Sequence, residues 1–468
     1  MKSEKKQTKR TGNELKAIFK SYDELYAEGK KLREKCPRTS HAEWKPPKNR
    51  PDPLSQLKES SKGRIPELIP IRYARMLQSP FTLYRGSAMS MASDLASTPA
   101  TGLRVQACGD AHLCNFGAYA TPERRVIFDL NDLDETLPAP WEWDIKRLAA
   151  SFVHACRSNG FKKAVARDMA LSCVRLYRQS MAEFSEMSTL AVWYACTDVE
   201  SLIAMAKDKE TQKRVQKRLA EGRNKAVHEG LFPKLVSADG ATPKIKDDPP
   251  LIYHPREHKQ KGFADIFRKA FADYRESLPE HIRVVLDRFK FLDVALKVVG
   301  VGSVGTACAV VLLMANENDS LFLQVKEAGP SVLEPYAGKS QFASHGKRIV
   351  LGCRLMQAAS DIFLGWTQSE TGRHFYIRQL KDVKISPVVD VFPPPVMEQY
   401  AELCGRTLAH GHASTGDSVK IAGYMGKSDT FDEAIADFSV AYADQGEQDH
   451  EVLKKAVRAG NLEVADIG

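Results

Sequence analysis

Apolar residues change their spacing along this chain, and that change limits the folds it can adopt. Between residues 104 and 130 they form three short runs typical of strands, LRVQACGD, NFGAYAT and RRVIFDL, and the last two are joined by the turn Pro122-Glu123-Arg124. From Trp141 they recur every three or four positions, as in WEWDIKRLAASFVHACRSNGF, and helical segments continue to about residue 230. The pattern therefore changes from strands to helices near Trp141.

A second strand-rich block begins near residue 290. FLDVALKVVGVGSVGTACAVVLL, LFLQVKEA and RHFYIRQL are its candidate strands, with a helix expected at about residues 340 to 360. The stretch SADGATPKIKDDPPLIYHPREHK before it is typical of a loop, and the chain after Met397 is mostly helical in pattern. Together the two blocks predict an α+β fold, and the 468 residues exceed one compact core.

Composition excludes several classes of protein. No run of about eighteen apolar residues occurs, so we expect no membrane span. The basic N-terminus lacks a following apolar segment, which argues against a secretory signal. The nine cysteines include no CxxC pair, which argues against a disulfide framework or a structural zinc site and favours a reducing cytoplasm. We interpret the charge of +9 as partly a solvated tail, so nucleic acid is an unlikely partner.

The stretch CGDAHLCNFG could carry catalysis. Protein kinases place the catalytic aspartate five residues before a metal-binding asparagine, and Asp110 and Asn115 have that separation. The alternative is that both side chains satisfy backbone groups in a turn. A strand before the stretch and a hairpin after it favour a catalytic loop, in which His112 is a hydrogen-bond partner rather than a base.

The hairpin after this loop leads to acidic residues suited to magnesium. Asp132 is the first candidate ligand beside Asn115, followed by Asp134 and then Asp129. Asp132 and Asp134 flank one apolar residue and would point the same way from an extended chain. Any of these acids could instead cap the turn that follows.

The stretch VGVGSVGT could bind phosphate. Gly300, Gly302 and Gly305 give a G-x-G-x-x-G spacing that includes Ser303, and Lys326 lies on the next strand, as in the ATP grip of kinases. The alternative is a dinucleotide-binding turn of the Rossmann type, for which ACAVVLLMA would be the helix and Asp319 the acid. Its β-branched residues and the following NEND favour strands instead.

The order of these motifs is unusual, because kinases place the glycine loop and its lysine before the catalytic loop. If both assignments hold, the chain is circularly permuted, which is feasible when the termini lie close together. The choice of the glutamate that pairs with Lys326 stays open between Glu334 and Glu327.

Arg85 and Arg378, expected on strands, could contact phosphate or form salt bridges. His410 and His412 are separated by two positions on a helix and face apart, which argues against a joint metal site.

Several of these motifs resemble a known family. GDAHLCN resembles the Gly-Asp-x-His-x-x-Asn core of the aminoglycoside phosphotransferase-like kinases, and PWEWDIKRLA, with Asp144, resembles the start of their next helix. SPFTLYRG, FDLNDLDET, LQVKEAGPSVLE, QAASDIFLGW and AYADQ are similar to the DUF2252 family of uncharacterised bacterial proteins, over about residues 45 to 460. That family is grouped with the protein-kinase-like superfamily, which implies a two-lobed kinase-like fold. Cys108 departs from the histidine that often precedes Gly-Asp in the phosphotransferases.

These observations lead to one hypothesis and two alternatives. The hypothesis is an ATP- and Mg-dependent phosphotransferase that acts on a hydroxyl acceptor not identified by the sequence. The alternatives are a nucleotide sensor or AMP-transferring protein on the same scaffold, and a Rossmann-type dinucleotide enzyme. Four segments are expected: a basic extension at 1–65, a C-lobe-like unit at 66–280, a nucleotide-gripping sheet at 281–390, and returning helices at 391–468.

Overall fold

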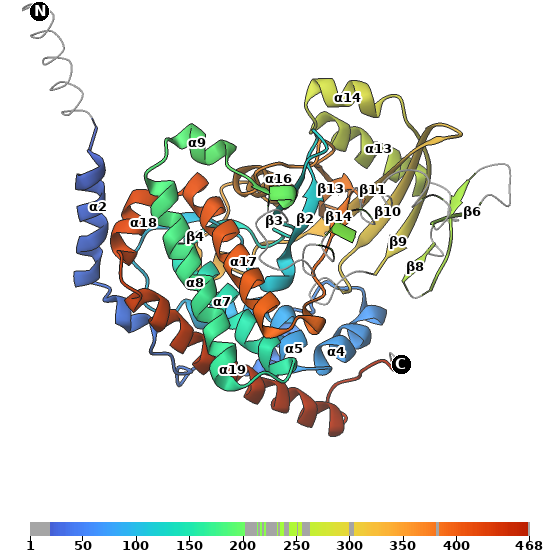
Figure 1. Cartoon of the computed structure of the whole chain (residues 1–468). Coiled ribbons are helices and arrows are strands. Elements are labelled where there is room, and N and C mark those ends of the chain that lie inside the picture. The colour runs from blue at the N-terminus through green and yellow to red at the C-terminus, as the bar shows by residue number, and fades with distance from the viewer. Residues whose placement is uncertain are drawn as a thin grey trace, which may run out of the picture.

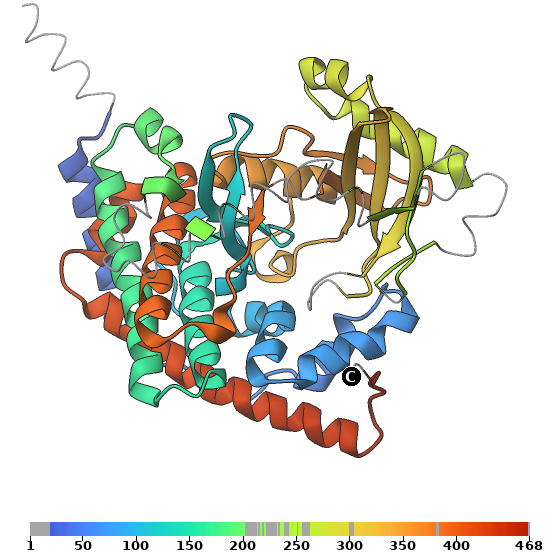
Figure 2. The same cartoon turned by 45° about the vertical axis from the view of Figure 1, so that its right-hand side comes forward.

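The structure is mixed in helix and strand, as the sequence predicts (Figure 1). The computed structural model of the chain describes residues 19–201, 213, 216–217, 220, 232, 235–237, 243–249, 251–254, 263–298, 304–380 and 383–466. Helices gather on one side of the molecule and a large antiparallel sheet lies on the other, with the hairpin of β2 and β3 between them (Figures 1 and 2). Within the described residues, no helix combines the length and the hydrophobicity required to cross a membrane.

A bundle of long helices forms the larger core. Its helices are α7 (Trp141–Ser158), α8 (Lys163–Ser185), α9 (Thr189–Tyr194), α17 (Pro394–Thr415), α18 (Ser418–Met425) and α19 (Thr430–Arg458). Helix α7 lies at its centre, with nearly every residue from Trp141 to Cys156 buried. The ring of Trp141 stacks on that of Tyr177 from α8, at 5.8 Å between centroids. Residues 141–185 and 394–458 therefore share one core although two hundred residues separate them.

The large sheet has the strand order β12-β13-β11-β10-β9-β8 and is antiparallel throughout. Its strands are β8 (Ile252–Tyr253), β9 (Lys290–Lys297), β10 (Cys308–Asn316), β11 (Asp319–Ala328), β12 (Gly365–Gln368) and β13 (His374–Gln379). Helices α13 (Phe263–Glu276) and α14 (Glu280–Leu286) cover one face through Tyr274 and Leu286. Both helices share the sheet's core although α13 precedes residue 281, where the sequence suggests a boundary, and α14 crosses it.

The opposite face of the large sheet, which α13 and α14 leave uncovered, is directed toward the helical bundle (Figure 2). Helix α16 (His345–Met356) follows β11 and the short α15 (Glu334–Ala337), and it packs on β11, β12 and β13. The small pair β6 (Val236–Ser237) and β7 (Lys244–Ile245) covers another part of this layer. Strands β6, β7 and β8 lie in the stretch 235–260 that the sequence pattern assigns to a loop.

A smaller sheet connects the two halves of the molecule. It has the order β14-β2-β3-β5, from β14 (Lys384–Ile385), β2 (Phe116–Ala120), β3 (Val126–Leu130) and β5 (Thr197–Asp198). The turn between β2 and β3 lies where the sequence predicts it, with Arg124 at a φ of 67°. Strands β1 (Arg104–Ala107) and β4 (Leu137–Pro140) pair beside it.

Residues before the first strand are largely helical. The helices are α2 (Tyr22–Lys31), α3 (Pro53–Glu59), α4 (Ile69–Leu77), α5 (Pro80–Gly86) and α6 (Ala88–Leu95), with 3-10 turns at Leu32–Glu34, Arg38–His41 and Pro66–Leu68. Further 3-10 turns, at Leu113–Asn115 and Val389–Val391, lie later in the chain. The prediction that Arg85 lies on a strand is wrong, because α5 contains it. Ser79 caps that helix with Thr82, and Pro80 occupies its first turn, so local capping outweighs the strand-forming residues Phe81 and Tyr84.

The dinucleotide alternative requires a helix where the structure has the strand that the sequence pattern favours. The segment that it requires as a helix, ACAVVLLMA, is strand β10, whose Ala309 pairs with Leu296 of β9 and Val325 of β11. The β-branched residues of this segment suit a pleated sheet better than a helix, and the turn from Asn316 to Asp319 closes a hairpin. The Rossmann prediction of a helix after the glycines is therefore wrong.

Candidate active site

The predicted catalytic loop connects β1 to the β2–β3 hairpin, and helix α7 holds it through hydrogen bonds to Asp144. Asp144 accepts hydrogen bonds from the backbone N–H groups of Cys108, at 2.5 Å, and Gly109, at 2.9 Å. The Nε2 atom of His412 on α17 lies 3.1 Å from the same carboxylate. Gly109 has a φ of 83°, and a Cβ at this position would lie 2.4 Å from the backbone oxygen of Glu135. The loop thus requires a glycine here and depends on two distant helices.

Asp110 is paired with an arginine of α7. The Nε atom of Arg147 donates to its Oδ1 at 2.6 Å, and Arg147 is buried with a side-chain exposure of 2%. Burial raises the pKa of Asp110 to about 6, against the opposing effect of Arg147. A carboxylate with this pKa is partly protonated in mildly acidic solution and can accept a proton at neutral pH.

His112 serves the loop from the other side. Its Nδ1 accepts the N–H of Cys114 at 3.2 Å, which leaves the proton on Nε2, and this atom lies 4.0 Å from Oδ2 of Asp110. Burial lowers the pKa of His112 well below its usual value, so the ring is neutral. This geometry fits the expected hydrogen-bonding role.

Asn115 begins the hairpin that joins the loop to the acidic residues. Its Nδ2 donates to the backbone oxygen of Asp110 at 2.9 Å, which leaves Oδ1 as the atom able to bind a cation. Its backbone oxygen accepts the N–H of Asn131 at 2.8 Å, so the two ends of the hairpin lie together. Asp132 is the next residue, which places it at the same end as Asn115.

The acidic cluster meets Lys326 of strand β11. The Nζ atom of Lys326 lies 2.7 Å from Oδ2 of Asp134 and 3.3 Å from Oδ1 of Asp132. Burial opposes the charge of Lys326, but the two carboxylates raise its pKa well above the usual value. Burial likewise opposes ionisation of Asp132, yet Lys326 and Arg378 hold the pKa of Asp132 below its usual range. The two predicted constellations therefore meet at one ion-paired cluster.

Asp129, the third metal candidate, lies elsewhere. It is buried and accepts the N–H groups of Leu130 and Ala358, each at 2.8 Å, and the hydroxyl of Tyr119 at 3.3 Å. These contacts link strand β3 to the end of helix α16. A carboxylate with both oxygens bound to protein donors suits a structural role better than a metal ligand.

The loop after Asp132 is held by helix α16. Arg348 donates to the backbone oxygens of Asp134, at 2.8 Å, Thr136, at 2.5 Å, and Gly329, at 2.9 Å. Glu135 accepts the N–H of Val332 at 2.7 Å, and burial raises its pKa to about 7 against the effect of Arg348. Neither Glu334 nor Glu327 contacts Lys326: Glu327 pairs with Arg373 and accepts the N–H of Ala307.

A cavity of about 610 Å³ lies between the large sheet and the β2–β3 hairpin. Its charged lining residues are Arg124, Asp132, Lys297, Lys326, Asp361, Arg378 and Lys384. Five of these are basic and two are acidic, so the cavity suits an anion. Tyr119, Leu133, Leu364 and Leu380 give it an apolar part as well, and its volume falls within the range of small-molecule sites.

The glycine turn is described only at its end. The predictions for Gly300, Gly302 and Ser303 fall outside the described residues. Gly305 has a φ of 88°, and its carbonyl accepts the N–H of Ile65 at 2.7 Å. Arg64 donates to the neighbouring carbonyl of Val304 at 2.6 Å. A segment far upstream therefore fixes the end of this turn.

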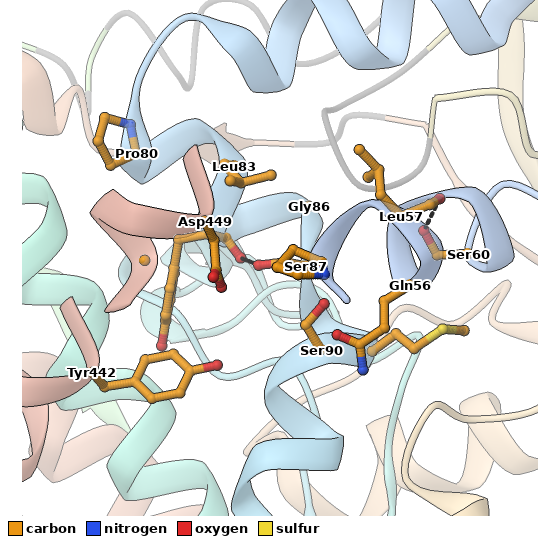
Figure 3. A pocket seen from close by; sticks show the side chains of 14 residues that line it. Gln56, Leu57, Ser60, Pro80, Leu83, Gly86, Ser87, Ser90, Tyr442 and Asp449 are labelled. Carbon is orange, nitrogen blue, oxygen red and sulfur yellow. Dashed lines mark hydrogen bonds between the residues drawn. The ribbon is translucent and has the colours of Figure 1, made fainter. Parts of the chain in front are cut away.

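A second cavity, drawn in Figure 3, has no part in this chemistry. It is lined by α3, α5, α6 and α19, including Ser87, Tyr442 and Asp449. Its volume of about 30 Å³ has room for about two water molecules, far too little for a nucleotide.

Sequence reasoning missed the roles of three residues of this site. Arg147 follows Asp144 by three positions on α7, a spacing that places both on one helix face, and this was a usable signal. Tyr376 stands two positions before Arg378 on β13 and so shares its face. The role of His412 had no sequence signal beyond its position on a helix.

Magnesium would need ligands beyond carboxylates here. Within the described part of the chain, no group of three or more histidine, cysteine, aspartate or glutamate side chains could hold a metal ion. Asn115 and Asp132 offer an amide and a carboxylate oxygen at the hairpin end, and Mg²⁺ often takes one or two protein ligands together with phosphates and water. Asn115 and Asp132 therefore fit a magnesium that takes its other ligands from phosphate and water.

Comparison with known proteins identifies the family. Residues 64–456 match the family described as "Uncharacterized protein conserved in bacteria (DUF2252)". No curated protein and no solved structure matches the chain significantly. Since the match spans most of the sequence and includes the Asp110 loop, the acidic hairpin end and Lys326, the chain belongs to the DUF2252 family.

Proposed function

We propose that this protein is an ATP- and Mg-dependent phosphotransferase that acts on a hydroxyl acceptor. The observation that supports it most is the contact of Lys326 with Asp132 and Asp134, at the end of the hairpin that follows the Asp110–Asn115 loop. The hypothesis requires Lys326 and this loop to share one cleft. A turn with an unrelated structural role would have no need of a buried lysine from a remote sheet.

The sheet supports the same proposal. Lys326 lies on the third strand of the meander β9–β10–β11, the glycine-containing turn joins the first two strands, and helix α16 follows. Protein kinases use a glycine loop and a third-strand lysine in this order to hold ATP. We propose accordingly that β8–β13 form the nucleotide-binding lobe of a kinase-like fold, in permuted order after the catalytic loop.

Each residue then has a role. Asp110 orients the acceptor hydroxyl and takes up its proton, while Arg147 holds the carboxylate in place. Lys326 and the glycine turn bind the phosphates. Arg378 of β13 lies on the same face of the sheet as Lys326 and adds positive charge there. Asn115 and Asp132 hold magnesium, with Asp134 beside them. When bound, magnesium neutralises charge on the transferring phosphoryl group.

One observation favours a second candidate, a nucleotide sensor or an AMP-transferring protein on this scaffold. Asp110 already forms a buried ion pair with Arg147 through Oδ1. An aspartate bound in this way can be a structural anchor instead of a base, in which case nucleotide binds without phosphoryl transfer to an acceptor.

Two measurements test the proposal. Thermal unfolding of the purified protein should shift upward with ATP plus Mg²⁺ and stay unchanged with NAD. Slow ATP turnover to ADP that Asp110→Ala abolishes, while ATP binding is retained, supports the phosphotransferase. Binding without turnover, or release of pyrophosphate, supports the second candidate, and failure to bind any nucleotide refutes both.

A further inference from the structure

In kinases, a glutamate on a helix positions the strand lysine on the phosphates. Helix α16 packs on the strand that carries Lys326, but its sequence HGKRIVLGCRLM contains no acidic residue. Lys326 is nevertheless buried, with a side-chain exposure of 6%, and a buried ammonium needs a carboxylate partner. The partner must come from another element.

Asp134 has the geometry of that partner. Its Oδ2 lies 2.7 Å from Nζ of Lys326, and its Oδ1 accepts the hydroxyl of Tyr376 at 2.6 Å. Tyr376 faces Lys326 directly across the β11–β13 pair, and the lysine Nζ lies 5.2 Å from the centre of its ring. Both carboxylate oxygens of Asp134 thus have donors from the sheet, and Lys326 is held from two sides.

Asp132 differs from Asp134 in the length of its contact with Lys326 and in its position at the large cavity. Its contact with Lys326 is longer, at 3.3 Å, and it lines the large cavity, whereas Asp134 does not. A divalent cation at Asp132 would repel the lysine ammonium from that carboxylate. Lys326 would then depend on Asp134 alone.

We propose that Asp134 is the positioning residue for Lys326, in place of a glutamate on the helix, and that Asp132 is thereby the metal ligand of the pair. This inference rests on the proposed function. Helix α16 contributes through Arg348, which binds the backbone oxygen of Asp134 and so fixes the loop that carries it. The lysine, the acidic loop and the helix form one unit. Among the described residues, Asp134 is then the carboxylate that stays paired with Lys326 once metal is bound at Asp132.

The first test needs no nucleotide. The reaction of Lys326 with an amine-specific acylating reagent is followed by mass spectrometry at one fixed pH in the full-length protein, for wild type, Asp134→Asn and Asp132→Asn with Mg²⁺ present. Loss of the positioning carboxylate should release the lysine side chain from its buried contact and speed acylation about tenfold, because the reagent then reaches the amine. Asp132→Asn should have a clearly smaller effect. Lys269, exposed and paired with Glu370, is the internal control and should react alike in all three proteins.

The second test separates positioning from metal binding. In Asp134→Asn we expect weaker ATP binding by about tenfold with and without Mg²⁺, and no further loss when Lys326→Gln is added. In Asp132→Asn we expect the Mg²⁺ dependence of ATP binding to disappear. If Asp134→Asn removes the Mg²⁺ dependence, or if Asp132→Asn speeds acylation of Lys326 more, the inference is overturned. If wild type binds no ATP, the proposed function fails, and the acylation rates still decide which aspartate holds the lysine.

Discussion

The Nζ atom of Lys326 lies 2.7 Å from Oδ2 of Asp134, although 192 residues separate them along the chain. This contact joins the large sheet to the loop that follows the β2–β3 hairpin. It also lies beside the 610 Å³ cavity, which Lys326 lines.

Replacing Lys326 with methionine should destabilise the protein. Asp132 and Asp134 would lose their shared cation in a buried setting, and we expect the free energy of unfolding to fall by about 3 kcal/mol at pH 7. The loss should be smaller at pH 5, because carboxyls without a cation have raised pKa values and become neutral there. Urea unfolding at pH 7 and at pH 5 measures this loss in the free energy of unfolding. Lys269→Met, at an exposed ion pair, is the matched control and should change stability by less than about 1 kcal/mol. Equal losses for the two variants would contradict the prediction.

The rate of ATP turnover should depend on the ionisation of Asp110. Burial raises the pKa of Asp110 to about 6, and only the ionised form accepts a proton, so kcat/KM should fall about tenfold per pH unit below pH 6. Arg147 opposes that raised pKa. Arg147→Gln should therefore move the acidic limb of the profile to higher pH. A limb that stays in place in this variant would argue against Asp110 as the base.

Gly109→Ala should disrupt the catalytic loop. The added Cβ would meet the backbone oxygen of Glu135 at 2.4 Å, in addition to the cost of a φ of 83°. Gly102 is the control, because its φ is 84° and nothing lies within 4 Å of its added Cβ. We expect Gly102→Ala to cost about 1 kcal/mol and Gly109→Ala at least twice as much, measured by chemical unfolding. Similar costs for both would show that the loop adjusts freely.

Local patterns were sufficient for several regular elements. The apolar run at residues 126–130, the alternation around Lys326 and the helical spacing after Trp141 predict β3, β11 and α7 correctly, because burial of side chains selects those patterns. Arg85 was misplaced because a capping box at Ser79 decides the conformation of a short segment that contains strand-forming residues.

Contacts between distant segments could not be predicted in detail. The spacing of Asp110 and Asn115 suggested the loop, but its support by Asp144 and His412 joins α7 to α17 across 268 residues. The sequence offered three acids for the metal and two glutamates for Lys326. Only the packing of β11 and β13 against the acidic loop distinguishes Asp134, which bonds Tyr376, from Asp129, which bonds Ala358.

The buried His154 on α7 should make the protein sensitive to acid. Neither ring nitrogen has a hydrogen-bond partner among the described residues, and burial lowers its pKa to about 3. Below pH 6.5 the unfolded chain binds a proton on this residue that the folded protein does not bind until about pH 3. The free energy of unfolding therefore falls by up to about 1.4 kcal/mol per pH unit over this window. His154→Leu should remove this contribution and gain about 2 kcal/mol on wild type between pH 6.5 and pH 5, measured by urea unfolding. His281→Leu, at an exposed position of α14, is the control and should keep the wild-type slope. If His154→Leu also keeps that slope, the folded protein accommodates a charged His154.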